Sequence, residues 1–250
     1  MADKMDMYYF SPTGGTKKVS SIFAAALGRD VVWHDLGSKQ TISEKPQSEL
    51  TVVAAPVFGG RIPSVVREKI KKLDGKGKKA VTIAVYGNRA YEDALLELND
   101  ILIEGGFTVI ASAVFVAQHS IVPEVGAGRP DLEDEKEIHA FAEAVQRSTA
   151  VENVQVPGNR PYKPEMNVAV TPVSLPSCTA CGVCEKACPT AAIALEDGKM
   201  VTDAEKCIFC LACIPACPQQ ARILPPPLLQ KTENMLAAFK TVRNKNEVFF

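Results

Sequence analysis

The sequence predicts a doubly wound α/β domain followed by a small cysteine-rich module, and three observations carry this prediction. Strand-like apolar runs alternate with helix-like segments over the first 150 residues. Apolar residues within these runs are continuous rather than alternating, as in strands that are buried on both faces of a parallel sheet. All eight cysteines of the 250-residue chain lie between Cys178 and Cys217, which marks a separate module.

Residues 1–150 are expected to form one sheet domain. The expected strands are the apolar runs Met5–Phe10, Val31–Leu36, Leu50–Val57, Ala80–Tyr86 and Phe107–Ala117. The expected helices are Thr16–Leu27, Pro63–Leu73, Tyr91–Gly105 and Asp131–Arg147. Strands and helices that alternate in this way form a three-layer domain around a parallel sheet, here with five strands.

The character of the chain changes after residue 150. Five prolines between residues 157 and 176 disfavour regular helix, so residues 151–172 are predicted to be an extended linker. The cysteine module follows over residues 173–227, and Asp197-Gly198 predicts a turn between two short strands within it. Residues 228–250 are expected to form a helical tail, because apolar residues recur there at helical spacing.

Composition narrows the class of protein. The chain is 46% hydrophobic, which is typical of a globular protein, and its formal net charge of −1 gives no support for nucleic-acid binding. The longest mostly apolar run, residues 107–117, falls short of the roughly 20 residues of a membrane span. The N-terminus has no apolar signal core, so we expect a cytoplasmic protein. Thiols stay reduced in the cytoplasm, which favours metal binding over disulfides.

The cysteines form two copies of the motif C-x2-C-x2-C-x3-C-P, offset by 29 residues. The duplicated motif resembles the bacterial two-cluster ferredoxin, in which the fourth cysteine of each run ligates the other cluster. The resemblance implies two 4Fe–4S clusters, one held by Cys178, Cys181, Cys184 and Cys217 and the other by Cys207, Cys210, Cys213 and Cys188. Two structural zinc sites are the alternative, since four-cysteine zinc sites also use C-x2-C pairs.

A loop rich in hydroxyl groups and glycine follows the first expected strand and leads directly into a helix. It contains neither a Walker motif nor a dinucleotide-binding motif. Its hydroxyls, its backbone N–H groups and the helix N-terminus suit a phosphate group, although the same residues are also ordinary helix-capping residues. The loop resembles the phosphate loop of flavodoxins, which implies that an FMN phosphate binds Ser11, Thr13, Gly14, Gly15 and Thr16.

Two further loops follow the third and fourth expected strands. In a flavodoxin-like sheet, ordered 2-1-3-4-5, the ligand lies beyond the carboxyl ends of the strands. By the same resemblance, Tyr91 stacks on the flavin ring, and Phe58 replaces the tryptophan of many flavodoxins because Trp33 is expected in the core. The implied ring-binding residues are Pro56, Phe58, Gly59, Gly60, Gly87, Asn88 and Tyr91. His119 follows the fifth strand near this edge, where a structural histidine is the commoner case.

The two parts together resemble the flavodoxin–ferredoxin fusion proteins of anaerobic bacteria and archaea. The resemblance implies an electron-transfer protein that exchanges electrons between its clusters and FMN. The alternative is an FMN-dependent reductase of a small-molecule acceptor such as a quinone. With clusters and FMN bound, the charge falls to roughly −7, which favours a redox partner protein with a basic docking face. The sequence leaves open whether the chain forms a homodimer and in which direction electrons flow.

Overall fold

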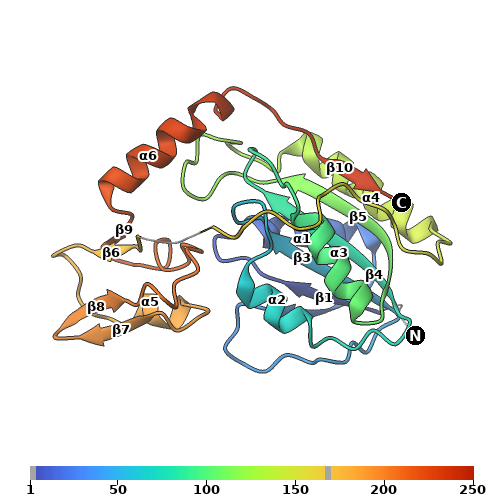
Figure 1. Cartoon of the computed structure of the whole chain (residues 1–250), viewed down its shortest axis with the longest axis horizontal. Coiled ribbons are helices and arrows are strands. Elements are labelled where there is room, and N and C mark those ends of the chain that lie inside the picture. Colours follow the sequence, from blue (N-terminus) through green and yellow to red (C-terminus); the bar gives the residue numbers. More distant parts are fainter. Residues whose placement is uncertain (1–3, 167–169) are drawn as a thin grey trace.

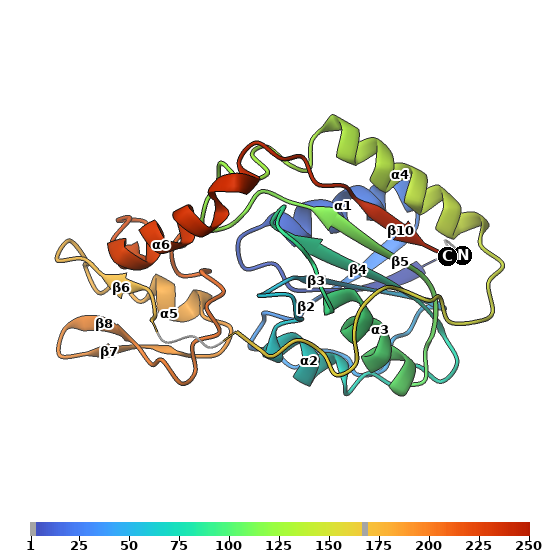
Figure 2. The same ribbon diagram turned by 45° about the horizontal axis from the view of Figure 1, so that its top comes forward.

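The computed structural model describes residues 4–166 and 170–250, and its first part is the expected parallel sheet. The strands β5, β4, β3, β1 and β2 lie in this order across the sheet and are parallel to one another (Figures 1 and 2). Their bounds are β1 (Lys4–Tyr9), β2 (Asp30–Asp35), β3 (Leu50–Pro56), β4 (Lys79–Tyr86) and β5 (Thr108–Val116). This is the 2-1-3-4-5 order of the flavodoxin-like fold, so the predicted fold class is confirmed.

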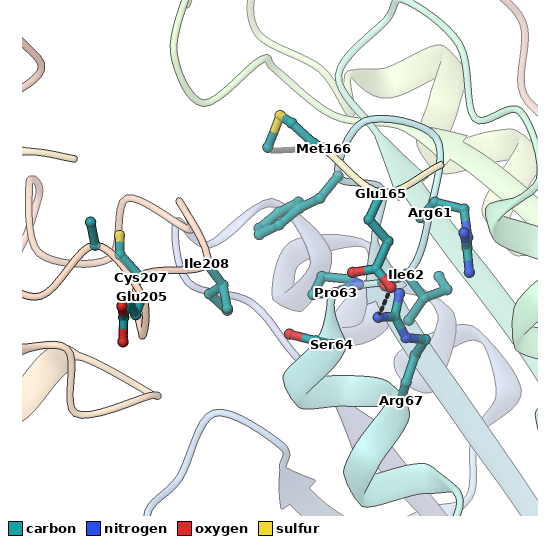
Figure 3. Close-up of a pocket in the computed structure, with 12 residues that line it drawn as sticks. Arg61, Ile62, Pro63, Ser64, Arg67, Glu165, Met166, Glu205, Cys207 and Ile208 are labelled. Carbon is teal, nitrogen blue, oxygen red and sulfur yellow. Dashed lines mark hydrogen bonds and ion pairs between the residues drawn. The ribbon is translucent and has the colours of Figure 1, made fainter. Parts of the chain in front are cut away.

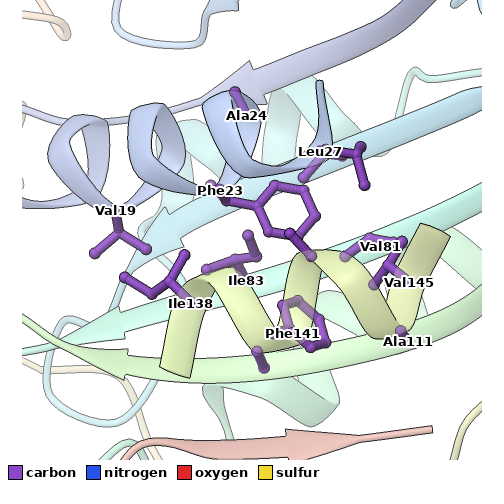
Figure 4. Close-up of a cluster of buried hydrophobic side chains, with 14 of the residues drawn as sticks. Val19, Phe23, Ala24, Leu27, Val81, Ile83, Ala111, Ile138, Phe141 and Val145 are labelled. Atoms are coloured by element: carbon purple, nitrogen blue, oxygen red, sulfur yellow. The ribbon is translucent and has the colours of Figure 1, made fainter. Parts of the chain in front are cut away.

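Helices cover both faces of the sheet and bury its two central strands. The helices are α1 (Gly15–Leu27), α2 (Ser64–Ile70), α3 (Ala94–Glu104) and α4 (Leu132–Arg147). On one face, Phe23 of α1 and Phe141 of α4 pack together with Ile83 of β4 (Figure 4). On the other face, α2 and α3 pack on the strands through residues such as Ile70 and Leu98. Burial on both faces explains the continuous apolar runs.

The edge strand β2 departs from the expectation. It pairs only with β1, and all six of its residues are exposed or half-buried. Trp33 is 37% exposed, and the Nζ atom of Lys17 lies 3.0 Å from the centroid of its ring. The prediction that Trp33 belongs to the core is therefore wrong. An apolar run alone does not distinguish an edge strand from a central one.

The segment between the two parts follows the surface of the sheet domain in an extended conformation. None of the described residues between 151 and 172 lies in a helix or strand, and residues 167–169 lie outside the described residues. The backbone N–H of Val154 donates to the carbonyl of Val109 in β5 (2.8 Å). The backbone N–H groups of Asn159 and Lys163 donate to the Asp93 carboxylate, at 2.8 and 2.7 Å. These bonds fix the path of the segment.

The cysteine module lies beyond the carboxyl ends of the parallel strands (Figures 1 and 2). It consists of β6 (Val173–Ser174), α5 (Val183–Ala187), β7 (Ile193–Glu196), β8 (Lys199–Thr202) and β9 (Arg222–Ile223). Strand β6 pairs with β9, and β7 pairs with β8, each antiparallel. The predicted turn at Asp197-Gly198 joins β7 to β8, and both of its residues have positive φ, 47° and 75°.

The C-terminal segment returns from the module to the sheet. After α6 (Pro226–Leu236) and a 3₁₀ turn, η1 (Ala237–Phe239), it ends in β10 (Glu247–Phe249), which pairs antiparallel with the outer edge of β5. The prediction of a wholly helical tail is wrong for these last residues, and the sheet has six strands rather than five. Strand β10 covers backbone groups of β5 that would otherwise form an open edge. Among the described residues, no helix is both long and apolar enough to span a bilayer.

A buried ion pair anchors the tail to the sheet domain. The side chains of Arg129 and Asp134 are 4% and 0% exposed, and they form a bidentate pair. Arg129 also donates to the carbonyl of Asn244 (2.6 Å), and the Asn246 side-chain amide donates to Asp134 (2.8 Å). The Asn88 side-chain oxygen accepts the backbone N–H of Asn244 (3.1 Å). The pair therefore satisfies polar groups of the tail as well as its own charges.

Replacing Arg129 by methionine is expected to lower the free energy of unfolding by about 3–5 kcal/mol, because Asp134 would keep a buried charge without a partner. The matched control is Arg147→Met, which removes an exposed pair with Glu143 on the same helix and is expected to change stability by less than about 1 kcal/mol. Urea unfolding followed by the fluorescence of Trp33, the one tryptophan, measures both. Equal effects of the two variants would contradict the anchoring role of Arg129.

Candidate cofactor sites

Cysteines from both runs meet in one small pocket of the module. Cys178, Cys181 and Cys184 of the first run line it together with Cys217, the last cysteine of the second run. This is the crossed grouping that the two-cluster resemblance implies. All eight cysteines are free thiols, and only Cys181 is exposed. Among the described residues, no group of three or more His, Cys, Asp or Glu side chains is arranged to hold a metal ion.

The remaining four cysteines influence one another electrostatically. Burial, together with the negative charges of Cys188, Cys213 and Cys207, raises the pKa of Cys210 to about 12. Burial and the charge of Cys188 likewise raise the pKa values of Cys207 and Cys213. Thiols must lose their protons to bind a metal, so a positively charged cluster core is what would stabilise four thiolates here. Cys188, the last cysteine of the first run, therefore lies near the cysteines of the second run. Cys217, the last cysteine of the second run, lies with those of the first.

The duplication extends to the backbone of the module. Left-handed residues occur in pairs 29 positions apart: Ala180 and Phe209 have φ of 54° and 56°, and Ala191 and Gln220 have φ of 52° and 51°. The hydrogen bonds match as well, since the N–H groups of Ala192 and Ala221 donate to the sulfurs of Cys188 and Cys217, both at 3.2 Å. Non-glycine residues adopt this conformation only where the surrounding structure imposes it, and they cluster at ligand sites.

The predicted phosphate loop leads into α1 and leaves the N-terminus of this helix open. Gly14 is the N-cap residue with φ of 92°, no side chain caps the helix, and no acidic residue lies in its first turn. Ser11 instead accepts the backbone N–H of Lys17 (2.8 Å), which closes the loop. Thr16 is 3% exposed and lies inside the helix rather than capping it. The open helix N-terminus fits an anion.

A cavity of about 850 Å³ joins this loop to the cysteine module. Thr13, Gly14 and Gly15 line one part of it, and apolar residues of the module and α6, such as Leu211 and Ile214, line another. A second pocket, of about 510 Å³, lies between α2 and the module and is lined by Phe58, Pro63, Cys207 and Ile208 among others (Figure 3). Both cavities are formed by the sheet domain and the second cysteine run together.

The predicted ring-binding residues do not line one common pocket but contact different parts of the protein. Phe58 lines the 510 Å³ pocket and packs against Phe10, with ring centroids 6.5 Å apart. Gly60 lies against the carboxylate of Glu92, and Gly87 lies against the ring of His119, where an added Cβ would be 2.5 Å from a ring carbon. Gly59 lies against Met166, and Pro56 is the last residue of β3.

The C-terminal tail binds two of these residues, a contact that no local feature of the sequence indicated. The Asn88 amide donates to the carbonyl of Val242 (2.6 Å), and Asn88 is fully buried with a φ of 57°. The Tyr91 hydroxyl donates to Glu247 (3.1 Å), and its ring packs edge-on against Tyr86. The loop that follows β4 is therefore held by the tail.

His119 has a structural role in the wall of the 850 Å³ cavity. Its Nδ1 atom accepts the backbone N–H groups of Ile121 and Val122, both at 3.2 Å. Burial, together with the positive charge of Arg89, lowers the pKa of His119 to about 4. The imidazole is therefore neutral at pH 7, as its two accepted hydrogen bonds require.

Residues 177–221 match the family model of the 4Fe–4S dicluster domain. A comparison with curated proteins finds no match to this chain. Among solved structures, the flavodoxin of Streptococcus pneumoniae is 20% identical with a TM-score of 0.44, and the match covers 56% of this chain and 95% of that one. Flavodoxin 1 of Bacillus cereus is 20% identical with a TM-score of 0.46, and the match covers 58% and 99% of the two chains.

The protonation of His119 is expected to make the fold sensitive to acid. Between pH 6.5 and 4 the unfolded chain binds a proton at this residue that the folded chain does not, so stability is full above pH 6.5 and falls as the pH falls. His119→Gln keeps a hydrogen-bond acceptor and is expected to lose roughly 1 kcal/mol less than the wild type between pH 7 and 5, allowing for partial exposure. Urea unfolding at both pH values measures this difference. Identical losses in the two proteins would contradict it.

The strand order of the sheet and the matched family model together define the architecture of the chain. Its sheet has the strand order of a flavodoxin, and its cysteine module matches the 4Fe–4S dicluster domain. The chain therefore has the architecture of a flavodoxin–ferredoxin fusion.

Proposed function

We propose that the protein transfers electrons between two 4Fe–4S clusters in its module and an FMN bound at the carboxyl edge of its sheet. The observation that carries this proposal is the 850 Å³ cavity, because the predicted phosphate loop and the second cysteine run line it together. When bound, the clusters would supply one-electron transfer, and the flavin would supply one- or two-electron transfer. The chain itself supplies the binding and the relative placement of these groups.

The crossed cysteine groups are proposed to hold the clusters. The shared pocket of Cys178, Cys181, Cys184 and Cys217 supports the first set of ligands. The mutual charge effects among the other four thiols support the second set, Cys188, Cys207, Cys210 and Cys213. Backbone N–H groups that donate to the sulfurs of Cys178, Cys188 and Cys217 would stabilise the thiolates.

The FMN phosphate is proposed to bind the loop that precedes α1. The uncapped helix N-terminus and the glycine φ of 92° at Gly14 support this placement. The ring is proposed to lie against the two neighbouring loops, which carry Pro56, Phe58, Gly59, Gly60, Gly87, Asn88 and Tyr91. Asn88 is fully buried, so it would shape its loop rather than contact the ring. The tail would fix the second of these loops through Asn88 and Tyr91. The backbone N–H groups at the uncapped start of α1 would bind the phosphate oxygens without requiring a salt bridge.

The two clusters would have different positions along the electron route. Ile208 and Cys210 of the second run pack against the core of the sheet domain, and Cys207 lines a pocket with Phe58. In Figure 3, Cys207 and Ile208 lie across this pocket from Ser64 and Arg67 of α2. Cys181 of the first run is instead exposed. The first run would therefore exchange electrons with an outside partner, and the second run with the flavin.

A second candidate is an FMN-dependent reductase of a small acceptor. The apolar walls of the 850 Å³ cavity favour it, since residues such as Ile121, Ile214 and Leu229 would suit a planar apolar molecule beside the flavin. Stopped-flow oxidation of the reduced protein by a quinone and by a ferredoxin separates the two functions. Faster oxidation by the quinone favours the reductase, and faster oxidation by the ferredoxin favours the electron carrier.

Anaerobic purification is expected to yield about eight iron atoms, about eight sulfides and about one FMN per chain. Zinc in place of iron, or iron without flavin, would overturn the proposed function. Cys217→Ala is expected to remove about half of the iron and to leave the cluster of Cys207, Cys210 and Cys213 intact.

Electron paramagnetic resonance of the reduced protein distinguishes the two clusters in these variants. Cys217→Ala and Cys181→Ala are expected to leave the same residual spectrum, because both would remove the same cluster. Cys210→Ala serves as the matched control, which is expected to leave the other spectrum. If Cys217→Ala instead left the same residual spectrum as Cys210→Ala, the crossed ligation would be contradicted.

A further inference from the structure

Arg222 is a buried cation inside the cysteine module. It lies on β9, five residues after Cys217, and is 2% exposed, which makes it one of the largest fully buried side chains of the protein. In the duplicated motif Arg222 occupies the position of Ile193, 29 residues earlier, which is buried in an apolar cluster.

The hydrogen-bond partners of Arg222 are all neutral. Its guanidinium donates to the hydroxyl of Ser174 (2.9 Å), the carbonyl of Pro172 (2.9 Å) and the hydroxyl of Thr202. Its Nε atom has no partner, and within the described part of the chain no carboxylate forms an ion pair with it. A buried charge without a counter-charge is strongly unfavourable, so this site calls for a negative group nearby.

The cysteines are the negative groups within reach of Arg222. It lines the pocket formed by Cys178, Cys181, Cys184 and Cys217. It also donates to the carbonyl of Met200 (3.4 Å), and Met200 packs in one buried cluster with Cys188 and Cys213 of the other set. One cation is therefore placed between both groups of proposed ligands.

A purely structural role explains these observations less well. The guanidinium does connect β6, β8 and the residue before β6 through its hydrogen bonds. The equivalent position of the first repeat, however, is satisfied by the apolar Ile193. A neutral donor could also make the same bonds to two hydroxyls and a carbonyl. A purely structural role therefore does not explain why the side chain at this position is positively charged.

We propose that Arg222 is a positioning residue that sets the charge balance of both clusters and raises their reduction potentials. This inference rests on the proposed function, since it requires the clusters to be bound as described. A cluster held by four thiolates is negatively charged, and reduction adds one further electron without making or breaking a bond. A fixed cation in a site of low dielectric constant stabilises the reduced form more than the oxidised form. Arginine keeps its charge at every pH at which proteins are folded.

The test is a redox titration of the intact, loaded protein followed by electron paramagnetic resonance. Arg222→Gln is expected to lower the equilibrium constant for reduction of each cluster at least tenfold, which is about 59 mV for a one-electron couple. Arg222→Lys keeps the charge and is expected to remain within threefold of the wild type. Thr202→Val removes a neutral partner of the guanidinium but keeps the charge, and it is the matched control with no expected change.

Equal potentials in the wild type and Arg222→Gln, at equal iron content, would overturn this inference and leave the proposed function standing. A wild type without iron would overturn the proposed function instead. If Arg222→Gln does not retain iron, Arg222→His provides the charge reversibly. The cluster reduction potentials of Arg222→His are expected to fall relative to those of the wild type as the pH rises from 6 to 9, because the histidine loses its charge. If the potentials of both proteins changed with pH in the same way, the inference would be overturned. Failure of both variants to retain iron would assign Arg222 to assembly and overturn it too.

Discussion

The placement of the cysteine module depends on the attachment of both its ends to the sheet domain. On the entering side, Asp93 accepts the backbone N–H groups of Asn159 and Lys163, which fixes the extended segment. On the leaving side, the buried Arg129–Asp134 pair binds the tail through Asn244, and β10 pairs with β5. A module attached at one end could swing on its linker. Attachment at two ends restricts it to the carboxyl edge of the sheet.

This constraint gives the duplicated module two unlike halves. The halves share their left-handed residues and their hydrogen bonds to sulfur, yet Cys210 packs against the core of the sheet domain while Cys181 is exposed. A repeat that is symmetric in sequence becomes asymmetric because one side of it is covered. Arg222 breaks the symmetry in a second way, since it occurs in one repeat and is placed between the two groups of thiols.

Features with local causes could be predicted from the sequence. The central strands follow from continuous apolar runs, and the loop before α1 follows from its glycines and hydroxyls. Features that depend on contacts between distant segments could not be predicted from the sequence. Strand β10 has three residues and exists because β5 offers it an open edge. The exposure of Trp33 follows from the place of β2 in the sheet, and the binding of Asn88 by Val242 joins residues far apart in the chain.

This architecture suits electron transfer within one chain, between the cluster of the second cysteine run and the flavin. Rapid photoreduction of the clusters, followed by the appearance of reduced flavin at several protein concentrations, measures that step directly. If the groups are held together by one chain, the rate constant is independent of protein concentration. A rate that rises in proportion to the concentration would show that electrons pass between separate molecules, and it would contradict the placement described above.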